Sequence, residues 1–296
     1  MGCRFEVLID RGHGSLDPGA IDAVAIGIEE LVMDWHSRLS AFEHGSITAM
    51  INRAPAGRPV LIDPEMYTLC ALCERVRVAT GGCFHIGAGT MMHALGFRGV
   101  CGADLQGLDL RQAVTLDERS STIVRHDERV RIDFGGIAKG FVLDLVREEL
   151  RGYGITNAFV HGGTSSVMAL GVDADGRDWA VRSGSVDLGV GGYGIGISEP
   201  TGRELLDGGD RVGHVVDPRD RACSGRRVIG EGFERVVVVH ESAAVADALS
   251  TAVCVDASSL PAAIDSGIGE LSCVVRGMDG AERVLIDGLG VVSGLD

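Results

Sequence analysis

Apolar residues recur every three or four positions in several stretches of the chain, which is the spacing of one helix face. This pattern predicts four long helices, over residues 21–39, 64–79, 138–150 and 243–255. The second begins at Pro64 after Asp63, a pair typical of a helix start, and Gly152 would end the third. The fourth consists mainly of small residues and therefore favours close packing against its neighbours.

Short apolar or alternating runs predict strands between these helices. We expect them over residues 3–10, 121–134 (one or two strands ending at Asp133), 157–163 and 234–241. The valine run of the last is typical of a strand buried on both faces. Residues 80–108 are rich in glycine and expected to be irregular, while 165–213 and the C-terminal part should form short strands and loops.

Helices and strands follow one another without a strict alternation, and no long linker or fixed-period repeat divides the chain. This arrangement favours an α+β fold, with mixed sheets and packed helices, in a single compact unit over residues 1–296.

The charge balance excludes one class of partner. The chain has 42 acidic and 27 basic residues, a net charge of −15, so nucleic acid is not an expected partner. A small anion could still bind where a local positive charge or a metal offsets this background. No apolar run approaches ~18 residues, so membrane insertion is not expected. The N-terminus shows no signal-peptide pattern, which favours a cytoplasmic location, although an export segment upstream of this sequence remains open.

The cysteines give little indication of chemistry. Cys70 and Cys73 form a CxxC pair, but it falls inside the predicted helix 64–79, where a spacing of three places both on one face. Buried, unpaired thiols are the favoured interpretation. A zinc site that recruits Cys83 or His85 is the alternative, although no second CxxC accompanies the first.

The octet DFGGIAKG, residues 133–140, contains the only lysine among 27 basic residues, Lys139. Its glycines would let a ligand approach the backbone, and the start of the following helix would offer free N–H groups to an anion. Lysine is a compact point charge and arginine a broad planar fork, so a narrow phosphate site could accept the first alone. The alternative is an ordinary turn between a strand and a helix.

The stretch VADALSTA contains Asp247 and Thr251, four residues apart and hence on one face of the predicted helix. Carboxylate, hydroxyl and carbonyl oxygens suit a hard cation such as Mg²⁺. A solvated aspartate is the alternative, but the surrounding alanines predict a tightly packed helix, where an unpaired carboxylate would be costly.

Two further motifs are less specific. In GHVVDPR, His214 could serve as a general base or contact a ligand, or it could be a satisfied histidine at the end of a strand. The glycine turn HGGTSSVMALG, residues 161–171, indicates little by itself.

Taken together and in order, these motifs resemble the ApbE family of FAD:protein FMN transferases. The matching segments are the initial MG, LSAFEHGSITAMIN, GGCFHIG, DFGGIAKGFVLD, HGGTSSVMALG, GHVVDPR and VADALSTA, which cover nearly the whole chain. The resemblance implies an ApbE-like, T-fold-related structure. It also implies an Mg²⁺-dependent enzyme that moves FMN from FAD to a Thr or Ser hydroxyl of an acceptor protein, expected to be a redox subunit, and releases AMP.

The resemblance also assigns roles to residues. The metal ligands would be Asp247, Thr251, the carbonyl of Gly136 and, beside them, Ser250. Asp133 and Lys139 would contact FAD, and Phe42 would stack on the flavin nucleotide. The remaining pocket residues would be Met1, Cys83, Phe84, His85 and Val216, and His214 would be catalytic.

The chain departs from the family pattern at several of these places. The usual AFD is CFH, so that His85 replaces a carboxylate, and DPRTG reads DPRDR. The Ser-Gly-x-Tyr before the histidine is reduced to SEP, and HGG replaces NGG or LGG. Two alternative functions therefore stay open: an FAD pyrophosphatase with water as the acceptor, and a flavin-binding protein without turnover.

Overall fold

The largest element of the fold is a seven-stranded sheet with the order β1-β5-β6-β9-β12-β13-β14, in which neighbouring strands are antiparallel. The structure is a computed structural model and describes residues 3–10, 18–97, 104–200, 204–207, 210–220 and 232–294. The seven strands are β1 (Phe5–Ile9), β5 (Ala158–Gly162), β6 (Ser166–Leu170), β9 (Gly194–Ser198), β12 (Phe233–His240), β13 (Leu271–Gly277) and β14 (Glu282–Asp287).

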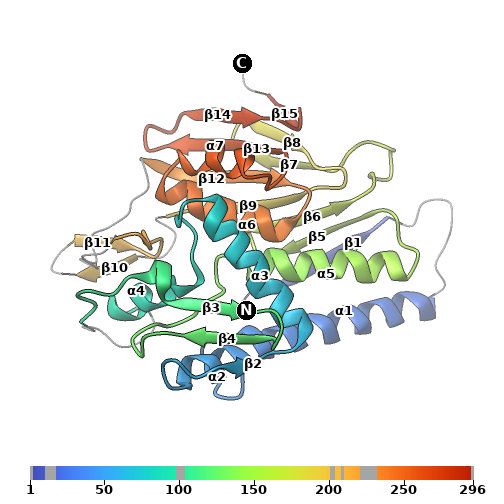
Figure 1. The fold of residues 1–296 in the computed structure, drawn as a ribbon. Coiled ribbons are helices and arrows are strands. Elements are labelled where there is room, and N and C mark those ends of the chain that lie inside the picture. Colours follow the sequence, from blue (N-terminus) through green and yellow to red (C-terminus); the bar gives the residue numbers. More distant parts are fainter. Residues whose placement is uncertain are drawn as a thin grey trace.

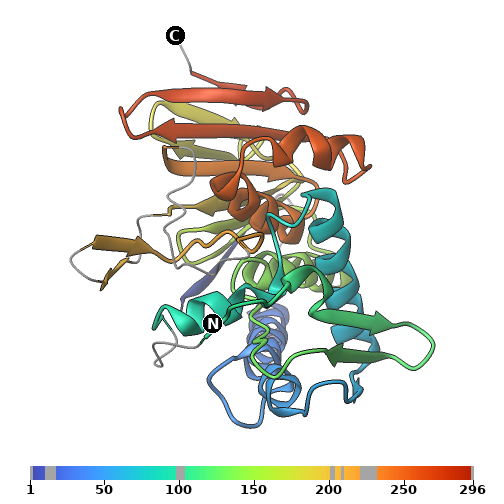
Figure 2. The ribbon, with the colours of Figure 1, turned by 60° about the vertical axis from the view of Figure 1, so that its left-hand side comes forward.

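Helices cover one face of this sheet (Figure 1). Two helices, α5 and α6, lie directly on the sheet, and α1 packs against α5. Figure 2 shows α3 extending from a small sheet toward α6 and α7. The described α-helices are α1 (Pro18–Leu39), α2 (Ile47–Arg53), α3 (Pro64–Ala79), α4 (Gly89–Ala94), α5 (Ala138–Gly152), α6 (Ala243–Val255) and α7 (Ser259–Asp265). Two 3₁₀ turns, η1 (Ile86–Ala88) and η2 (Leu110–Gln112), complete the described helical segments.

Smaller sheets flank the main one. The sheet β15-β8-β7 buries Val186 and Leu188 against inward-facing valines of the main sheet, on the face away from α5 and α6. The others are β2-β4-β3 and the pair β10-β11. Their strands are β2 (Val60–Leu61), β3 (Val114–Asp117), β4 (Thr122–Arg125), β7 (Ala180–Ser183), β8 (Val186–Gly189), β10 (Glu204–Asp207), β11 (Asp210–Gly213) and β15 (Val292–Ser293).

The contact between α6 and the sheet depends on glycines. A Cβ at Gly194 would lie 2.4 Å from the Cα of Ala243, and one at Gly196 would lie 2.3 Å from the backbone of Ala246. The small residues of α6 therefore rest on the bare backbone of β9, and almost every residue of α6 is buried. This close approach brings the middle of α6 within reach of side chains on the strands.

Most of the expected elements are present. The α+β unit is confirmed, as are helices at 64–79 and 243–255, which end where the sequence indicated. The start of α3 is also confirmed, because Asp63 accepts a hydrogen bond from the Met66 N–H. None of the described helices is long and apolar enough to cross a lipid bilayer.

Three expectations about local structure are wrong. The strand predicted over 121–134 ends at Arg125, because the side chain of Arg125 turns inward and donates to the carbonyls of Val130 and Ile51. This buried guanidinium holds residues 126–130 in a turn instead of a ladder. The glycine-rich stretch at 80–108 contains α4 and a 3₁₀ turn, and the C-terminal part contains α7 in addition to its strands. The sequence pattern did not predict α2.

The glycine contact gives a stability prediction. We expect Gly196→Ala to lower the free energy of unfolding by about 1–3 kcal/mol, since its methyl group would overlap the α6 backbone. Gly152→Ala is the matched control: a Cβ there meets nothing within 4 Å, and alanine favours the helix. Urea denaturation of both variants measures the difference. Equal stability of the two would contradict the close packing of α6 on β9.

Candidate active site

Asp247 lies at the centre of the candidate site, on α6, and is only 4% exposed. Its carboxylate accepts hydrogen bonds from two groups on other elements. The hydroxyl of Ser166, on β6, lies 2.7 Å from Oδ1 and 2.9 Å from Oδ2, and the Gly140 N–H of α5 lies 2.8 Å from Oδ2. Lys139 brings its Nζ to 3.7 Å from the same Oδ2. Burial raises the pKa of Asp247, and the positive charge of Lys139 opposes that rise.

Three hydroxyls extend the site from Asp247 toward solvent. Ser250 and Thr251 donate to the carbonyl oxygen of Asp247, at 2.9 and 3.2 Å, so their own oxygens remain available as acceptors. Ser198, at the end of β9, lies 2.8 Å from the Ser250 oxygen and 3.4 Å from that of Thr251. Ser250 is buried, whereas Thr251 and Ser198 are partly exposed. The result is a row of hard oxygen atoms beside a buried carboxylate.

The glycine turn before α5 closes this row. A Cβ at Gly136 would lie 3.3 Å from the Thr251 hydroxyl oxygen, so the turn and α6 are in close contact. Gly135 is exposed and Gly136 partly so, and the Lys139 side chain is 21% exposed. The sequence-predicted residues Gly136, Lys139, Asp247, Ser250 and Thr251 are thus brought together.

The start of α5 differs from the expectation in one respect. The N–H groups of Ile137 and Ala138 donate to the carbonyl of Phe134, and that of Gly140 donates to Asp247. The sequence had suggested that these N–H groups are free to bind an anion, but they are already hydrogen-bonded within the protein. The charge of Lys139 is what remains to attract one.

Asp133 is positioned by a network that the sequence analysis missed. Its N–H donates to the Ile86 carbonyl at 2.9 Å, and its Oδ1 accepts from the Gly135 N–H at 2.7 Å. The preceding residue, Ile132, is held by Asn52 of α2, whose side chain both donates to and accepts from the Ile132 backbone. Asn52 thereby ties α2 to the segment that carries Asp133.

The triplet Cys83, Phe84 and His85 is buried, but its side chains have different neighbours. A Cβ at Gly136 would lie 3.4 Å from the Phe84 ring, so Phe84 borders the glycine turn. Cys83 lies in the electrostatic field of Arg219, and burial raises its thiol pKa to about 11. His85 faces α3 instead.

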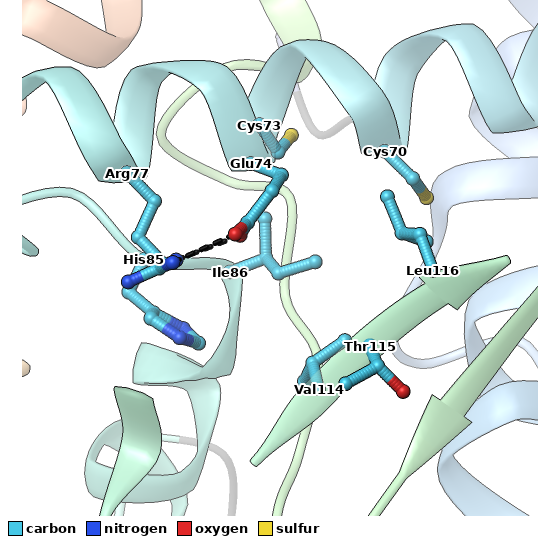
Figure 3. Close-up of a pocket in the computed structure, with 9 residues that line it drawn as sticks. All are labelled: Cys70, Cys73, Glu74, Arg77, His85, Ile86, Val114, Thr115 and Leu116. Carbon is cyan, nitrogen blue, oxygen red and sulfur yellow. Dashed lines mark hydrogen bonds and ion pairs between the residues drawn. The ribbon is translucent and has the colours of Figure 1, made fainter. Parts of the chain in front are cut away.

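His85 borders a separate cavity of about 230 Å³ between α3 and β3 (Figure 3). The lining residues are Cys70, Cys73, Glu74, Arg77, His85, Ile86, Val114, Thr115 and Leu116. Arg77 forms an ion pair with Glu74 above the imidazole. The cavity shares no residue with the Asp247 cluster. The candidate site is therefore placed at the Asp247 cluster, where a carboxylate, a lysine and hydroxyl groups meet.

The imidazole of His85 caps the 3₁₀ turn η1. Its Nδ1 accepts a hydrogen bond from the Gly87 N–H at 2.7 Å. An aspartate at this position, as in the family pattern AFD, could accept a hydrogen bond from the same backbone N–H with its carboxylate. The histidine therefore preserves the local turn. Burial, followed by the charge of Arg77, lowers the pKa of His85 to about 4.

His214 and Val216 follow β11, in a segment that contacts other parts of the fold on both sides of His214. A Cβ at Gly213 would lie 2.5 Å from the Pro200 carbonyl oxygen, and Val216 packs beside the small cluster around Met91. Further on, Arg219 bonds Asp217 and also reaches Asp256 at the end of α6. His214 is half-buried, and its catalytic role stays a prediction.

The remaining flavin-pocket residues are less informative. Phe42 lies in the turn between α1 and α2 and is 69% exposed. Its contact with flavin stays a prediction. Met1 lies outside the described residues.

The interpretation of Cys70 and Cys73 as buried, unpaired thiols is confirmed. Burial raises the pKa of Cys70 to about 12 and that of Cys73 well above its ordinary value. No three histidine, cysteine, aspartate or glutamate side chains converge on a metal position within the described residues. This finding gives no support to zinc at Cys83 or His85, and the Asp247 cluster has a single carboxylate.

Comparison with known proteins identifies the family. The sequence profile of the ApbE family matches residues 1–272. A relative from Vibrio cholerae, named FAD:protein FMN transferase, is 24% identical over 272 residues, which are 86% of this chain and 79% of the relative. A protein of the same name from Rhodobacter capsulatus is 28% identical over 275 residues, 85% of this chain and 50% of its own length.

Solved structures agree on the fold. The crystal structure of an ApbE protein from Thermotoga maritima superposes with a TM-score of 0.77 at 23% identity, covering 95% of this chain and 97% of that one. The flavin transferase ApbE from Vibrio cholerae also gives 0.77, at 21% identity, covering 96% and 94%. The α+β architecture is thus that of flavin transferase structures. With the profile match, the chain belongs to the ApbE family, as its motifs had indicated.

The histidine cap gives a pH prediction. In the unfolded chain His85 titrates near 6.5, whereas in the folded protein its pKa is about 4. Stability from the neutral imidazole is therefore complete above pH 6.5 and is lost as the pH falls toward 4. His85→Asn keeps an acceptor for Gly87 and does not titrate. Between pH 7 and pH 4, we expect wild type to lose about 3 kcal/mol more unfolding free energy than this variant. Urea denaturation at each pH measures the loss, and parallel curves would contradict the assignment.

Proposed function

We propose that this chain is an Mg²⁺-dependent FAD:protein FMN transferase, which moves FMN from FAD to a Thr or Ser hydroxyl of an acceptor protein and releases AMP. The observation that carries the proposal is the meeting of Lys139, the glycine turn and the Asp247 oxygen cluster, which combines a site for a diphosphate with ligands for a hard cation. The names of the relatives support the transfer of FMN from FAD to a protein.

The oxygen atoms around Asp247 fit a small hard cation. Asp247 supplies one buried negative charge, and Ser250 and Thr251 supply oxygens whose protons are directed back into α6. Mg²⁺ commonly binds one or two carboxylates and completes its shell with water and substrate phosphate. Asp247, Thr251, Ser250 and the Gly136 carbonyl would hold the ion. When bound, Mg²⁺ would neutralise charge on the diphosphate and on the departing AMP.

The residues of this chain would act on FAD as follows. Lys139 would attract the diphosphate to the exposed turn at Gly135, which has no side chain of its own. Asp133 and Phe42 would orient the rest of the nucleotide. His214 would accept the proton of the acceptor hydroxyl, whose oxygen forms the new bond to the FMN phosphorus as the bond to the AMP oxygen breaks.

Product analysis tests this reaction. With FAD and Mg²⁺, addition of a Thr-bearing acceptor protein should accelerate AMP release, measured by chromatography, and attach FMN to the acceptor, measured by mass spectrometry. Free FMN at a rate independent of the acceptor would show a pyrophosphatase instead. Flavin binding without AMP would show a binding protein. Either result would replace the proposed function.

Two aspartates allow a matched control for this assay. Asp247→Asn should reduce AMP release by orders of magnitude, because a charged ligand is lost from the metal site. Asp144, on α5, accepts hydrogen bonds from the first N–H groups of α6 but does not face the oxygen cluster. Asp144→Asn should therefore destabilise the same pair of helices and keep its turnover. Comparable activity of the two variants, or turnover in excess EDTA, would reject the metal site.

The lone lysine gives a second test. Lys139→Met removes the charge, and Lys139→Arg keeps it but changes its shape. We expect each to weaken FAD binding by about 1–3 kcal/mol, the value of a charge-assisted hydrogen bond. Titration of FAD at fixed salt measures the loss, and Arg75→Met, a charge removed from the exposed face of α3, is the control. An arginine variant that binds as tightly as wild type would reject the requirement for a compact cation.

A further inference from the structure

Ser166 occupies an unusual position relative to the Asp247 carboxylate. Its Oγ lies 2.7 Å from one carboxylate oxygen and 2.9 Å from the other. An atom at nearly equal distances from both oxygens lies in the open angle between them. A cation bound by both oxygens of one carboxylate would have to occupy that same place.

The fold holds Ser166 firmly in this position. It is the first residue of β6, is fully buried, and pairs with Gly162 on one side and Gly196 on the other. Because a Cβ at Gly196 would lie 2.4 Å from the Asp247 backbone nitrogen, α6 presses directly onto the sheet at this point. The Ser166 side chain is fully buried, so its hydroxyl does not reach solvent.

The other contacts of the carboxylate fall on one of its two oxygens. Oδ2 also accepts the Gly140 N–H at 2.8 Å, and Lys139 lies 3.7 Å away from it. With Ser166 between the two oxygens, an ion can reach Asp247 only from outside that angle, through a single oxygen. Mg²⁺ accepts single-oxygen carboxylate ligands in a tight octahedron, whereas Ca²⁺ prefers more ligands and often takes both oxygens of a carboxylate.

We propose that Ser166 is a metal-specificity residue, which restricts Asp247 to single-oxygen coordination and thereby favours Mg²⁺ over Ca²⁺. This inference rests on the metal site of the proposed function. Ser166 acts through Asp247 and lies in the segment HGGTSSVMALG, whose sequence alone gave no role.

The test is the ratio of the Ca²⁺ and Mg²⁺ dissociation constants, measured by calorimetry with each metal alone and no FAD. Ser166→Ala vacates the angle between the two oxygens, and we expect it to shift the ratio toward Ca²⁺ by on the order of tenfold. Ser166→Cys keeps a side chain there and should stay near the wild-type ratio. Ser272→Ala is the matched control, since Ser272 is a buried serine that donates to a different carboxylate, Asp287. Its ratio should equal that of wild type.

The outcomes separate this inference from the proposed function. If wild type prefers Mg²⁺ but Ser166→Ala leaves the ratio unchanged, Ser166 has only a structural role and the inference fails while the proposed function stands. If wild type prefers Ca²⁺, the inference fails. This outcome needs only the wild-type protein, so the inference can be tested even if Ser166→Ala does not fold. If wild type binds neither ion, the metal site itself is wrong and both proposals fail.

Discussion

The structure depends on a reciprocal capping of two helices. Asp247 of α6 accepts the Gly140 N–H in the first turn of α5, and Asp144 of α5 accepts the first N–H groups of α6. Both contacts require the helices to touch where a Cβ at Gly140 would lie 2.1 Å from the Ala243 carbonyl oxygen. Each carboxylate compensates the positive end of the other helix, and together they fix the helices in one register. The position of the central carboxylate is therefore a property of the fold.

The Asp247 side chain therefore contributes both to the packing of the two helices and to the candidate site. A carboxylate as deeply buried as Asp247 is costly unless hydrogen bonds and an opposite charge compensate it, and Gly140, Ser166 and Lys139 supply both. The Ser166 hydroxyl occupies the place between the two carboxylate oxygens. The row of hydroxyls begins at the buried Ser250 and ends at the partly exposed Ser198. The cluster is therefore buried at one end and accessible to solvent at the other.

The sequence predicted those elements and site residues that are determined by the local pattern of residues. The helices at 64–79 and 243–255 follow from apolar spacing and a start signal, and Lys139 with Asp247 follows from motif and composition. It did not predict the end of β4, because the buried Arg125 binds carbonyls from α2, far away in the chain. Ser166, Asn52 and Asp144 were missed for the same reason: each acts through a partner about 80 or more residues away, and such a pairing leaves no mark on the local pattern.

The single lysine follows from the geometry of the carboxylate. Elsewhere in the chain arginine binds aspartate with two parallel hydrogen bonds, as Arg129 does with Asp127 and Arg182 with Asp187. An arginine at position 139 could engage Asp247 in the same way and would compete for the angle that Ser166 fills. Lysine instead places one charge 3.7 Å from a single oxygen, beyond a strong hydrogen bond. It compensates the buried charge and leaves the carboxylate open to another cation, which is a physical reason for one lysine among 27 basic residues.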